Sequence, residues 1–354
     1  MADGFDKVLG CLAASQIGSA MGAAVEGWSY QAIRERYGRL EELLPYEHYG
    51  NGWKRPPGTT EDGIERQRVF LRAIRRARGR PTADDMAAVW REEVDAEKAA
   101  WCMEPFDRHL IRLAKAGVPG SELGRFNPYT NLVSLSRSCH PIGLVNAGDP
   151  AQAARDAHAV GRVLQQALGD GLTWAGAVAA AIAAAMVPDA TVDSVLSAAV
   201  DAGGPGLRDE IRRALDVADG ADDALAMREA FDAHYGGHGI AYAASQANEV
   251  VSKGLAVFRA TRGDPRAAIV TAVNFGRDTD CLAAVAGGLA GALKGTEGLP
   301  AAWLAQVDAA TEANPYTNLR LPLEAQARIV WDALALESKR AASRAAALRA
   351  VCEG

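Results

Sequence analysis

The sequence predicts an all-α protein. Its 354 residues are 49% hydrophobic, yet only 6% are aromatic, and alanine dominates the apolar fraction. Alanine is the best helix former, so this composition favours helices throughout. We find no convincing strand and no linker. The chain is therefore expected to form a single compact helical bundle over residues 1–354, long enough to bury a sizeable core.

Helices are expected over most of the chain. The first runs from about Phe5 to Ala24, and its small residues let other helices approach closely. Another covers residues 59–78, with Thr59 or Thr60 as its N-cap. Glu61 and Asp62 then fall in its first turn, where the helix dipole favours carboxylates. Further helices are expected at residues 84–103, 107–115, 150–167, 173–186, 192–202, 207–218, 221–233, 241–258, 265–273 and 282–293, and more follow to the C-terminus.

Two irregular stretches separate these helices. Residues 46–58 are rich in Gly, Pro and aromatic residues. Within them, residues 46–53 could stack on a base or simply pack, and we favour a mobile lid over the site. Residues 117–149 hold several Gly, Pro and Asn, and loops of this length in a compact domain are usually functional. The hexapeptide at residues 127–132 recurs identically at residues 314–319, but the flanks differ. We interpret the two copies as Pro-containing turns with Asn caps rather than as a structural repeat.

Charge and cysteine content exclude several classes of function. The formal net charge of −6 argues against a nucleic-acid or membrane-surface role. The five cysteines are scattered and never form a C-x-x-C pair, which is typical of a reducing compartment. No signal peptide is evident, and the apolar window 172–187 is shorter than the roughly 20 residues that span a bilayer. We therefore expect a cytoplasmic protein, either a monomer or a small homo-oligomer, without nucleic-acid or membrane partners.

Two acidic clusters carry the strongest functional signal. Asp278 and Asp280 lie two residues apart in a Gly-flanked turn before a small-residue helix, and Cys281 follows them. Far upstream, Glu61 and Asp62 follow a threonine. Each cluster alone is explained as well by helix capping as by metal binding. Two such clusters in one chain favour a site for Mg²⁺ or Mn²⁺, because these ions prefer hard oxygen ligands.

Glu26 ends the first predicted helix. A carboxylate is poorly placed there, because the helix dipole disfavours negative charge at a C-terminus. Taken alone, a solvated surface glutamate is the better explanation, although the misfit hints at a functional role.

These segments together resemble a known family. Residues 18–27, 60–62, 272–280 and 283–295 occur in an order and at spacings similar to those of the ADP-ribosylglycohydrolase family. That family includes the dinitrogenase-reductase-activating glycohydrolase and ADP-ribosyl-acceptor hydrolases. The resemblance covers about residues 5–295 and implies an all-α fold. It also implies a site with two Mg²⁺ or Mn²⁺ ions that bind the vicinal ribose hydroxyls and a water while the anomeric C–N or C–O bond is hydrolysed. For this chain we expect one or two such ions.

The resemblance also implies roles for individual residues. Glu26 matches an acidic residue that contacts the metal or the reacting water, and we expect it to be catalytic together with Glu61 and Asp62. Asn274, Gly276 and Arg277 would line the ligand side of the turn. His140 and His238 are weaker candidates for substrate contacts, and each is explained more simply as structural. The implied metal ligands are Thr60, Glu61, Asp62, Asp278, Asp280 and Cys281.

The chain departs from the family pattern in several places. The usual Thr-Asp-Asp-Thr is Thr-Glu-Asp-Gly at residues 60–63, and a Thr after the second Asp of the C-terminal motif is Cys281. A thiol is a poor ligand for Mg²⁺. A segment that lies by the substrate in the family is replaced by Ser-Leu-Ser-Arg-Ser-Cys-His at residues 134–140. Because the four carboxylates of both clusters remain acidic, we interpret the changes as a shift of substrate.

The favoured hypothesis is a divalent-metal-dependent hydrolase. It would cleave the N- or O-glycosidic bond of an ADP-ribosylated or nucleoside-like small molecule or side chain. One alternative is a non-catalytic, ligand-binding relative. Another is a transferase or lyase reaction on a nucleoside metabolite that uses the same scaffold.

Overall fold

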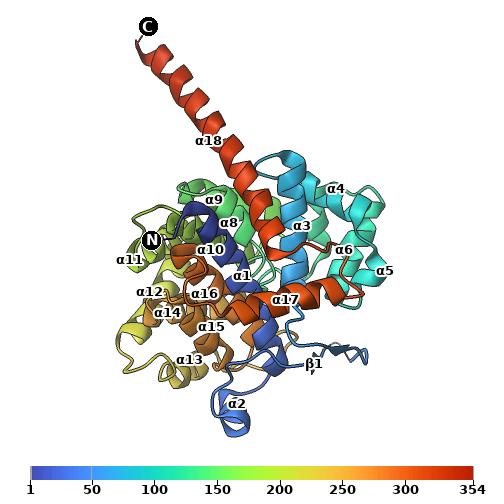
Figure 1. The fold of residues 1–354 in the computed structure, drawn as a ribbon, viewed down its shortest axis with the longest axis vertical. Coiled ribbons are helices and arrows are strands. Elements are labelled where there is room, and N and C mark those ends of the chain that lie inside the picture. The colour runs from blue at the N-terminus through green and yellow to red at the C-terminus, as the bar shows by residue number, and fades with distance from the viewer. Residues whose placement is uncertain (1, 49, 354) are drawn as a thin grey trace.

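A central pair of helices organises the molecule. In the computed structural model, which describes residues 2–48 and 50–353, α1 (Gly4–Gly22) packs along α16 (Thr279–Lys294). Helices α3–α6 lie to one side of this pair and α11–α14 to the other, while the end of α18 projects from the body (Figure 1). The all-α prediction is confirmed. The other helices are η1 (Ala23–Val25), α2 (Tyr30–Tyr37), α3 (Asp62–Ala77), α4 (Ala83–Glu93), α5 (Ala96–Ala99), α6 (Pro105–Lys115), α7 (Gly120–Leu123), η2 (Gly124–Phe126), α8 (His140–Val145), α9 (Pro150–Gly161), α10 (Gly171–Ala185), α11 (Val192–Ala202), α12 (Pro205–Asp219), α13 (Arg228–Tyr235), α14 (Ala247–Ala260), α15 (Pro265–Val273), α17 (Ala301–Ala313) and α18 (Leu323–Glu353).

Small residues let the central helices touch backbone to backbone. A Cβ atom added at Gly22 would lie 2.5 Å from the backbone nitrogen of Asp280, and one added at Gly18 would meet the carbonyl of Ala283. Only hydrogen fits at these positions, so the helices approach more closely than ordinary side chains allow. The start of α16 is thereby held against the end of α1.

The central helix α1 is also the most apolar long helix of the described chain. Together with η1 it spans 22 residues and is long and apolar enough to cross a membrane, but 89% of its most apolar window is buried inside the molecule. It thus serves here as a core helix. Apolar residues from Val8 to Val330 join it in one large buried cluster.

Most predicted helices form, and the boundary differences have local causes. Helices α11 and α15 match their predicted ranges. The predicted helix 84–103 is split, because Asp95 leaves the helix and caps α5 by accepting a hydrogen bond from Glu97 N at 2.9 Å. The predicted helix 221–233 begins only at Arg228, because Asp223 Oδ1 accepts bonds from two following amides and forms a turn.

Residues 46–58 contain a short hairpin, so the expectation of no strand was wrong. Strands β1 (Tyr46–Glu47) and β2 (Lys54–Arg55) pair antiparallel. Trp53, in the connecting loop, packs edge-on against Tyr316 with ring centroids 4.8 Å apart. The hairpin is therefore anchored by its aromatic residues to the segment before α18.

The two identical hexapeptides form the predicted turns. Asn127 Oδ1 accepts a hydrogen bond from Tyr129 N at 3.0 Å, and Asn314 Oδ1 accepts one from Tyr316 N at 2.9 Å. Both asparagines are buried. Each is thus an Asx turn that satisfies backbone amides locally.

The close approach of α1 and α16 makes a direct prediction about stability. Gly22→Ala places a methyl group against the backbone of Thr279 and Asp280, so we expect a loss of about 1–3 kcal/mol in the free energy of unfolding. Gly206→Ala is the matched control, since its Cβ meets nothing within 4 Å inside helix α12. Urea denaturation should show the control to be neutral or slightly stabilised. Equal effects of the two variants would contradict this view of the interface.

Candidate functional site

Three distant segments bring five acidic side chains together. Glu26 follows η1, Glu61 and Asp62 begin α3, and Asp278 and Asp280 begin α16. The two clusters predicted from the sequence therefore meet. Glu26 lies close enough to both that, besides desolvation, the charges of Asp280, Asp278 and Glu61 raise its pKa. All but Glu26 are buried, and the Glu26 side chain is 27% exposed.

The turn before α16 is shaped by its backbone. Gly276 and Arg277 both have positive φ values, 78° and 65°, and they reverse the chain after α15. Arg277 N donates to Trp28 O, and Gly27 N donates to Arg277 O, each at 2.7 Å. The turn is thus hydrogen-bonded to the residues that follow Glu26, and these bonds bring Glu26 close to Asp278 and Asp280.

Asp278 both caps α16 and leaves an oxygen free. Its Oδ1 accepts the hydrogen bond of Cys281 N at 3.3 Å, whereas its Oδ2 is buried and has no hydrogen-bond partner. Asp280 Oδ1 is buried without a partner as well. Removal from water, and then the charge of Asp280, raise the pKa of Asp278 well above its usual value. The capping and the ligand interpretations of this cluster are therefore compatible.

One metal ion fits these residues. Ligand atoms of Asp278, Asp280 and Cys281 all lie within 4.8 Å of one another, and this is the group of metal-ligating side chains that the described residues offer. Burial raises the pKa of the Cys281 thiol well above its ordinary value, so the thiol is protonated and donates poorly to a metal. The two unpartnered carboxylate oxygens are the donors suited to a hard cation.

An arginine lies between the two acidic clusters. Arg137 Nη1 donates to Asp280 Oδ2 at 2.7 Å, and its Nη2 donates to Asp62 Oδ1. Arg66 Nη2 takes the other oxygen of Asp62 at 2.6 Å and also binds Asp107. Both oxygens of Asp62 are therefore paired with guanidinium groups. Burial acts to raise the pKa of Asp62, but Arg137 and Arg66 outweigh it and hold the pKa below the usual value.

Glu61 and Glu26 are less firmly paired. Glu61 is the N-cap residue of α3 but makes no capping bond, and its Oε1 lies 3.7 Å from Arg55 Nε. Burial raises its pKa. Glu26 Oε2 lies 3.4 Å from His48 Nδ1. Burial, followed by the charges of Asp280 and Asp278, raises the pKa of Glu26 well above its usual value. Burial thus disfavours the charged form of both glutamates, and a cation nearby would favour it.

The residues predicted to line the ligand side of the turn make structural contacts. Asn274 is buried and bonds both backbone groups of Leu40, at 2.9 Å each. Gly276 pairs with Ser29 in an isolated bridge. Arg277 Nε binds Glu249 at 2.6 Å, and its Nη2 donates to the carbonyls of the segment before α14. These three residues shape the turn and tie it to its neighbours.

The remaining predicted residues make contacts outside the acidic cluster or are exposed. Thr60 Oγ1 accepts a bond from Arg68 Nη2 at 3.3 Å, so it faces a neighbouring network. His140 is fully buried, contacts Gln67, and lies 3.1 Å from the carbonyl of Ala284. Burial lowers its pKa to about 4, so the ring is neutral. His238 is exposed in the loop before α14. None of the three lines the cavity beside the acidic cluster.

That cavity is small and is lined by both polar and apolar side chains. Its volume is about 220 Å³. Clefts for drug-sized ligands measure roughly 300–1,000 Å³, so only a small part of such a ligand would fit inside. It is lined by Glu26, His48, Glu104, Phe106, Leu132, Val133, Ser134, Arg137, Tyr242, Ser245 and Cys281.

Glu104 is a site residue that the sequence did not reveal. It precedes Pro105 at the start of α6, where a glutamate reads as an ordinary helix-cap residue. In the fold its Oε2 accepts the hydrogen bond of the Tyr242 hydroxyl at 2.8 Å. Burial and then the charge of Asp62 raise the pKa of Glu104 to about 6. Its side chain can therefore exchange a proton near neutral pH inside the cavity.

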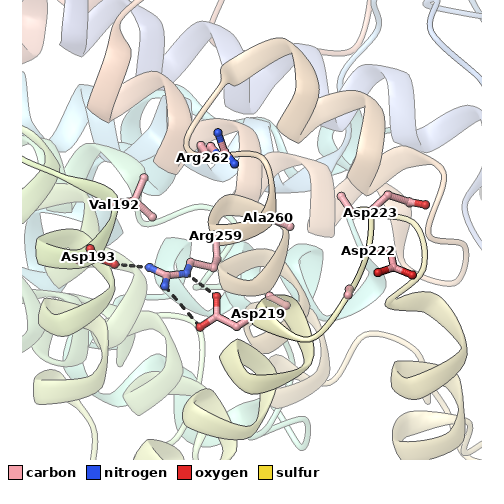
Figure 2. A pocket seen from close by; sticks show the side chains of 11 residues that line it. Val192, Asp193, Asp219, Asp222, Asp223, Arg259, Ala260 and Arg262 are labelled. Carbon is pink, nitrogen blue, oxygen red and sulfur yellow. Dashed lines mark hydrogen bonds and ion pairs between the residues drawn. The ribbon is translucent and has the colours of Figure 1, made fainter.

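A second cavity of about 460 Å³ lies between α11, α12 and α14 (Figure 2). There Arg259 is held by Asp193 and by Asp219, whose Oδ1 lies 2.8 Å from Arg259 Nε. Both aspartates are largely exposed, and ion pairs in such positions contribute little. This cavity shares no lining residue with the acidic site. We therefore assign the chemistry to the smaller cavity.

The fold and the site together define a class of protein. It is an all-α scaffold in which the first turns of two helices gather buried carboxylates beside a small cavity. The model of the ADP-ribosylglycohydrolase family matches residues 1–339, and the chain belongs to this family, which points to a glycohydrolase of that type.

Among solved structures, the chain is similar to one described as "ADP-ribosylglycohydrolase-related protein complex". The TM-score is 0.67 at 20% sequence identity, and the match covers 94% of this chain and 100% of that chain. At this identity the likeness shows the fold alone. No curated protein matches the sequence.

The environment of Glu104 predicts a pH-dependent difference in stability. Its pKa rises from 4.5 to about 6 on folding, so its protonated form favours the native state and this contribution is lost as the pH rises through 6. Glu104→Gln keeps an acceptor for Tyr242 and stays neutral. Relative to wild type, we expect this variant to gain about 1–2 kcal/mol of unfolding free energy between pH 4.5 and 7. Urea titrations across this range test it, and a constant difference would contradict the assignment.

Proposed function

We propose that this protein hydrolyses the N- or O-glycosidic bond of a ribosyl group, in an ADP-ribosylated or nucleoside-like substrate, with the help of a divalent ion. One observation carries the proposal. Carboxylates from three separate segments converge beside a cavity, and two of their buried oxygens, on Asp278 and Asp280, lack any partner. Unpaired buried carboxylates are costly, so a site that collects them serves a ligand.

Asp278 and Asp280 would hold the ion, which we expect to be Mg²⁺ or Mn²⁺. When bound, it would orient ribose hydroxyls and a water and lower the pKa of that water. The carboxylates must be ionised to bind it, so affinity for the ion should increase with pH.

The chain's own acids supply the proton transfers. Glycoside hydrolysis requires one carboxyl group to protonate the leaving group and another to activate water. Glu104 suits the first role, because it lines the cavity and its pKa of about 6 leaves part of the population protonated near neutral pH. Glu26 suits the second role. It also lines the cavity, it is partly exposed, and it lies beside Asp278 and Asp280.

The cavity restricts what reaches the acids. At about 220 Å³ it admits a sugar and the bond to be cleaved, and the rest of a larger substrate must lie at or beyond its mouth. Phe106, Leu132 and Val133 give it an apolar wall, which would limit the access of bulk water to the bond being cleaved.

A second candidate function is ligand binding without turnover. The observation that favours it is the pairing of Asp62, whose two oxygens are both taken by arginines. In that case the same cavity would bind a ribosyl compound, and no product would form.

Product analysis by mass spectrometry distinguishes the two functions. We would incubate the protein with ADP-ribosyl-arginine, ADP-ribosyl-serine, O-acetyl-ADP-ribose and free nucleosides, each with Mg²⁺, Mn²⁺ or EDTA. The hydrolase predicts release of ribose or ADP-ribose from at least one of them, abolished by EDTA. Asp278→Asn keeps the capping oxygen and removes the charge, so we expect at least a 100-fold loss of rate in a folded protein.

Asp222→Asn is the matched control, because Asp222 lines the separate cavity of Figure 2. It should cleave like wild type. Saturable binding of a ribosyl compound without any product would favour the binding function. Cleavage that persists in EDTA and in Asp278→Asn would rule out the proposed role of the ion.

A further inference from the structure

We infer that the guanidinium group of Arg137 takes the place of a divalent ion between Asp62 and Asp280, so that the site accepts one ion on Asp278 and Asp280 and no second one. The inference concerns the same site as the proposed function and rests on it for the class of ion. It assigns a fixed internal cation to the centre of the acidic cluster.

The contacts of Arg137 are those of a bridging cation. It reaches one acid from α3 and one from α16, with Nη1 on Asp280 and Nη2 on Asp62. Asp62 lies in the first turn of α3, and Asp280 lies in the first turn of α16. A guanidinium presents its donors in a planar fork that suits carboxylates, and it stays charged at every physiological pH. It therefore joins the two clusters permanently, as a metal would when bound.

The absence of a side chain at Gly63 leaves the space that Arg137 occupies. A Cβ atom at Gly63 would lie 2.7 Å from Arg137 Cδ, 2.9 Å from Nε and 3.0 Å from Cγ. Any residue larger than glycine at position 63 must push the Arg137 side chain aside. Gly63 comes directly after Asp62, so the position that admits the arginine adjoins the carboxylate that it binds.

Charge balance explains why one ion still fits. Arg66 is matched by Asp107 in a fully buried pair. The acids Glu26, Glu61, Asp62, Asp278 and Asp280 then face the guanidiniums of Arg55 and Arg137. Once these acids are ionised, negative charge is in excess, and the oxygens of Asp278 and Asp280 without a hydrogen-bond partner are the ones left to receive a cation. A second divalent ion would have to displace Arg137 from the carboxylates that it already neutralises.

Counting bound Mn²⁺ tests the inference without a substrate. Equilibrium dialysis followed by elemental analysis gives the number of ions per chain, and electron paramagnetic resonance separates single ions from coupled pairs. Two ions about 3.5–4 Å apart, as in two-metal sites, give an exchange-coupled spectrum. We expect one uncoupled ion per chain in wild type. Arg137→Met removes the guanidinium at similar length and should bind one ion more.

Two further variants keep the test decisive. Gly63→Ala displaces Arg137 without removing it and favours the helix, so it should also raise the Mn²⁺ count even if Arg137→Met does not fold. Arg68→Met is the matched control: Arg68 is also buried but pairs with Glu65, Thr60 and Thr311, and its loss should leave the Mn²⁺ count unchanged. Circular dichroism verifies that each variant is folded.

A coupled pair of ions in wild type would overturn the inference, and so would an unchanged count in both Arg137→Met and Gly63→Ala. The count does not depend on turnover. Failure of the cleavage assay with the expected counts would reject the proposed hydrolysis and leave the role of Arg137 standing. Cleavage by a wild-type protein that binds two ions would support the proposed hydrolysis and reject the role of Arg137.

Discussion

The close contact between α1 and α16 is the constraint on which the site depends. Where these helices meet, Gly22 leaves no space for a side chain against Thr279 and Asp280. The end of α1 and the start of α16 are thus held at backbone contact, and Glu26 arrives beside Asp278 and Asp280. The mutual hydrogen bonds between Arg277 and residues 27 and 28 fix the same junction from the loop side. Packing of small residues, together with these backbone hydrogen bonds, therefore sets the position of the acids.

Electrostatics then determines what such an arrangement can do. Buried carboxylates repel one another, and the cluster responds in two ways. Asp62 and one oxygen of Asp280 are neutralised by arginines, while burial and neighbouring charges raise the pKa values of Glu26 and Asp278. A cation that enters would favour the ionised forms of these two acids. Affinity for the ion and the protonation of the acids are therefore linked, and the site is most open to a metal where the acids are ionised.

Local patterns predicted the helices and the acids, but not the partners of the acids. Alanine content, caps and the D-x-D turn are local signals, and they located most helices and both clusters. Arg137 lies 75 residues from Asp62 in sequence and 143 from Asp280, so only the tertiary fold pairs them. Glu104 was missed for the same reason, since before Pro105 it has the appearance of a cap. Asn274 and His140 lie in segments that resemble the family's site. In the fold, however, Asn274 bonds the backbone of Leu40, and His140 is buried beside the carbonyl of Ala284.

The departures from the family pattern lie together in the structure, beside the acidic cluster. Residue 63 is glycine, the segment 134–140 contains an arginine, and residue 281 is cysteine, and all three positions adjoin the same acids. Gly63 admits Arg137, and Arg137 neutralises Asp62 and Asp280. Cys281 follows Asp280 with a thiol that burial keeps protonated, so it adds no charge to the ligand set. An arginine has no exchangeable coordination position, so it cannot bind a hydroxyl or activate a water as an ion would. Under the proposed function, Arg137 would join the two clusters structurally, and catalysis would be left to one ion and to the acids that face the cavity.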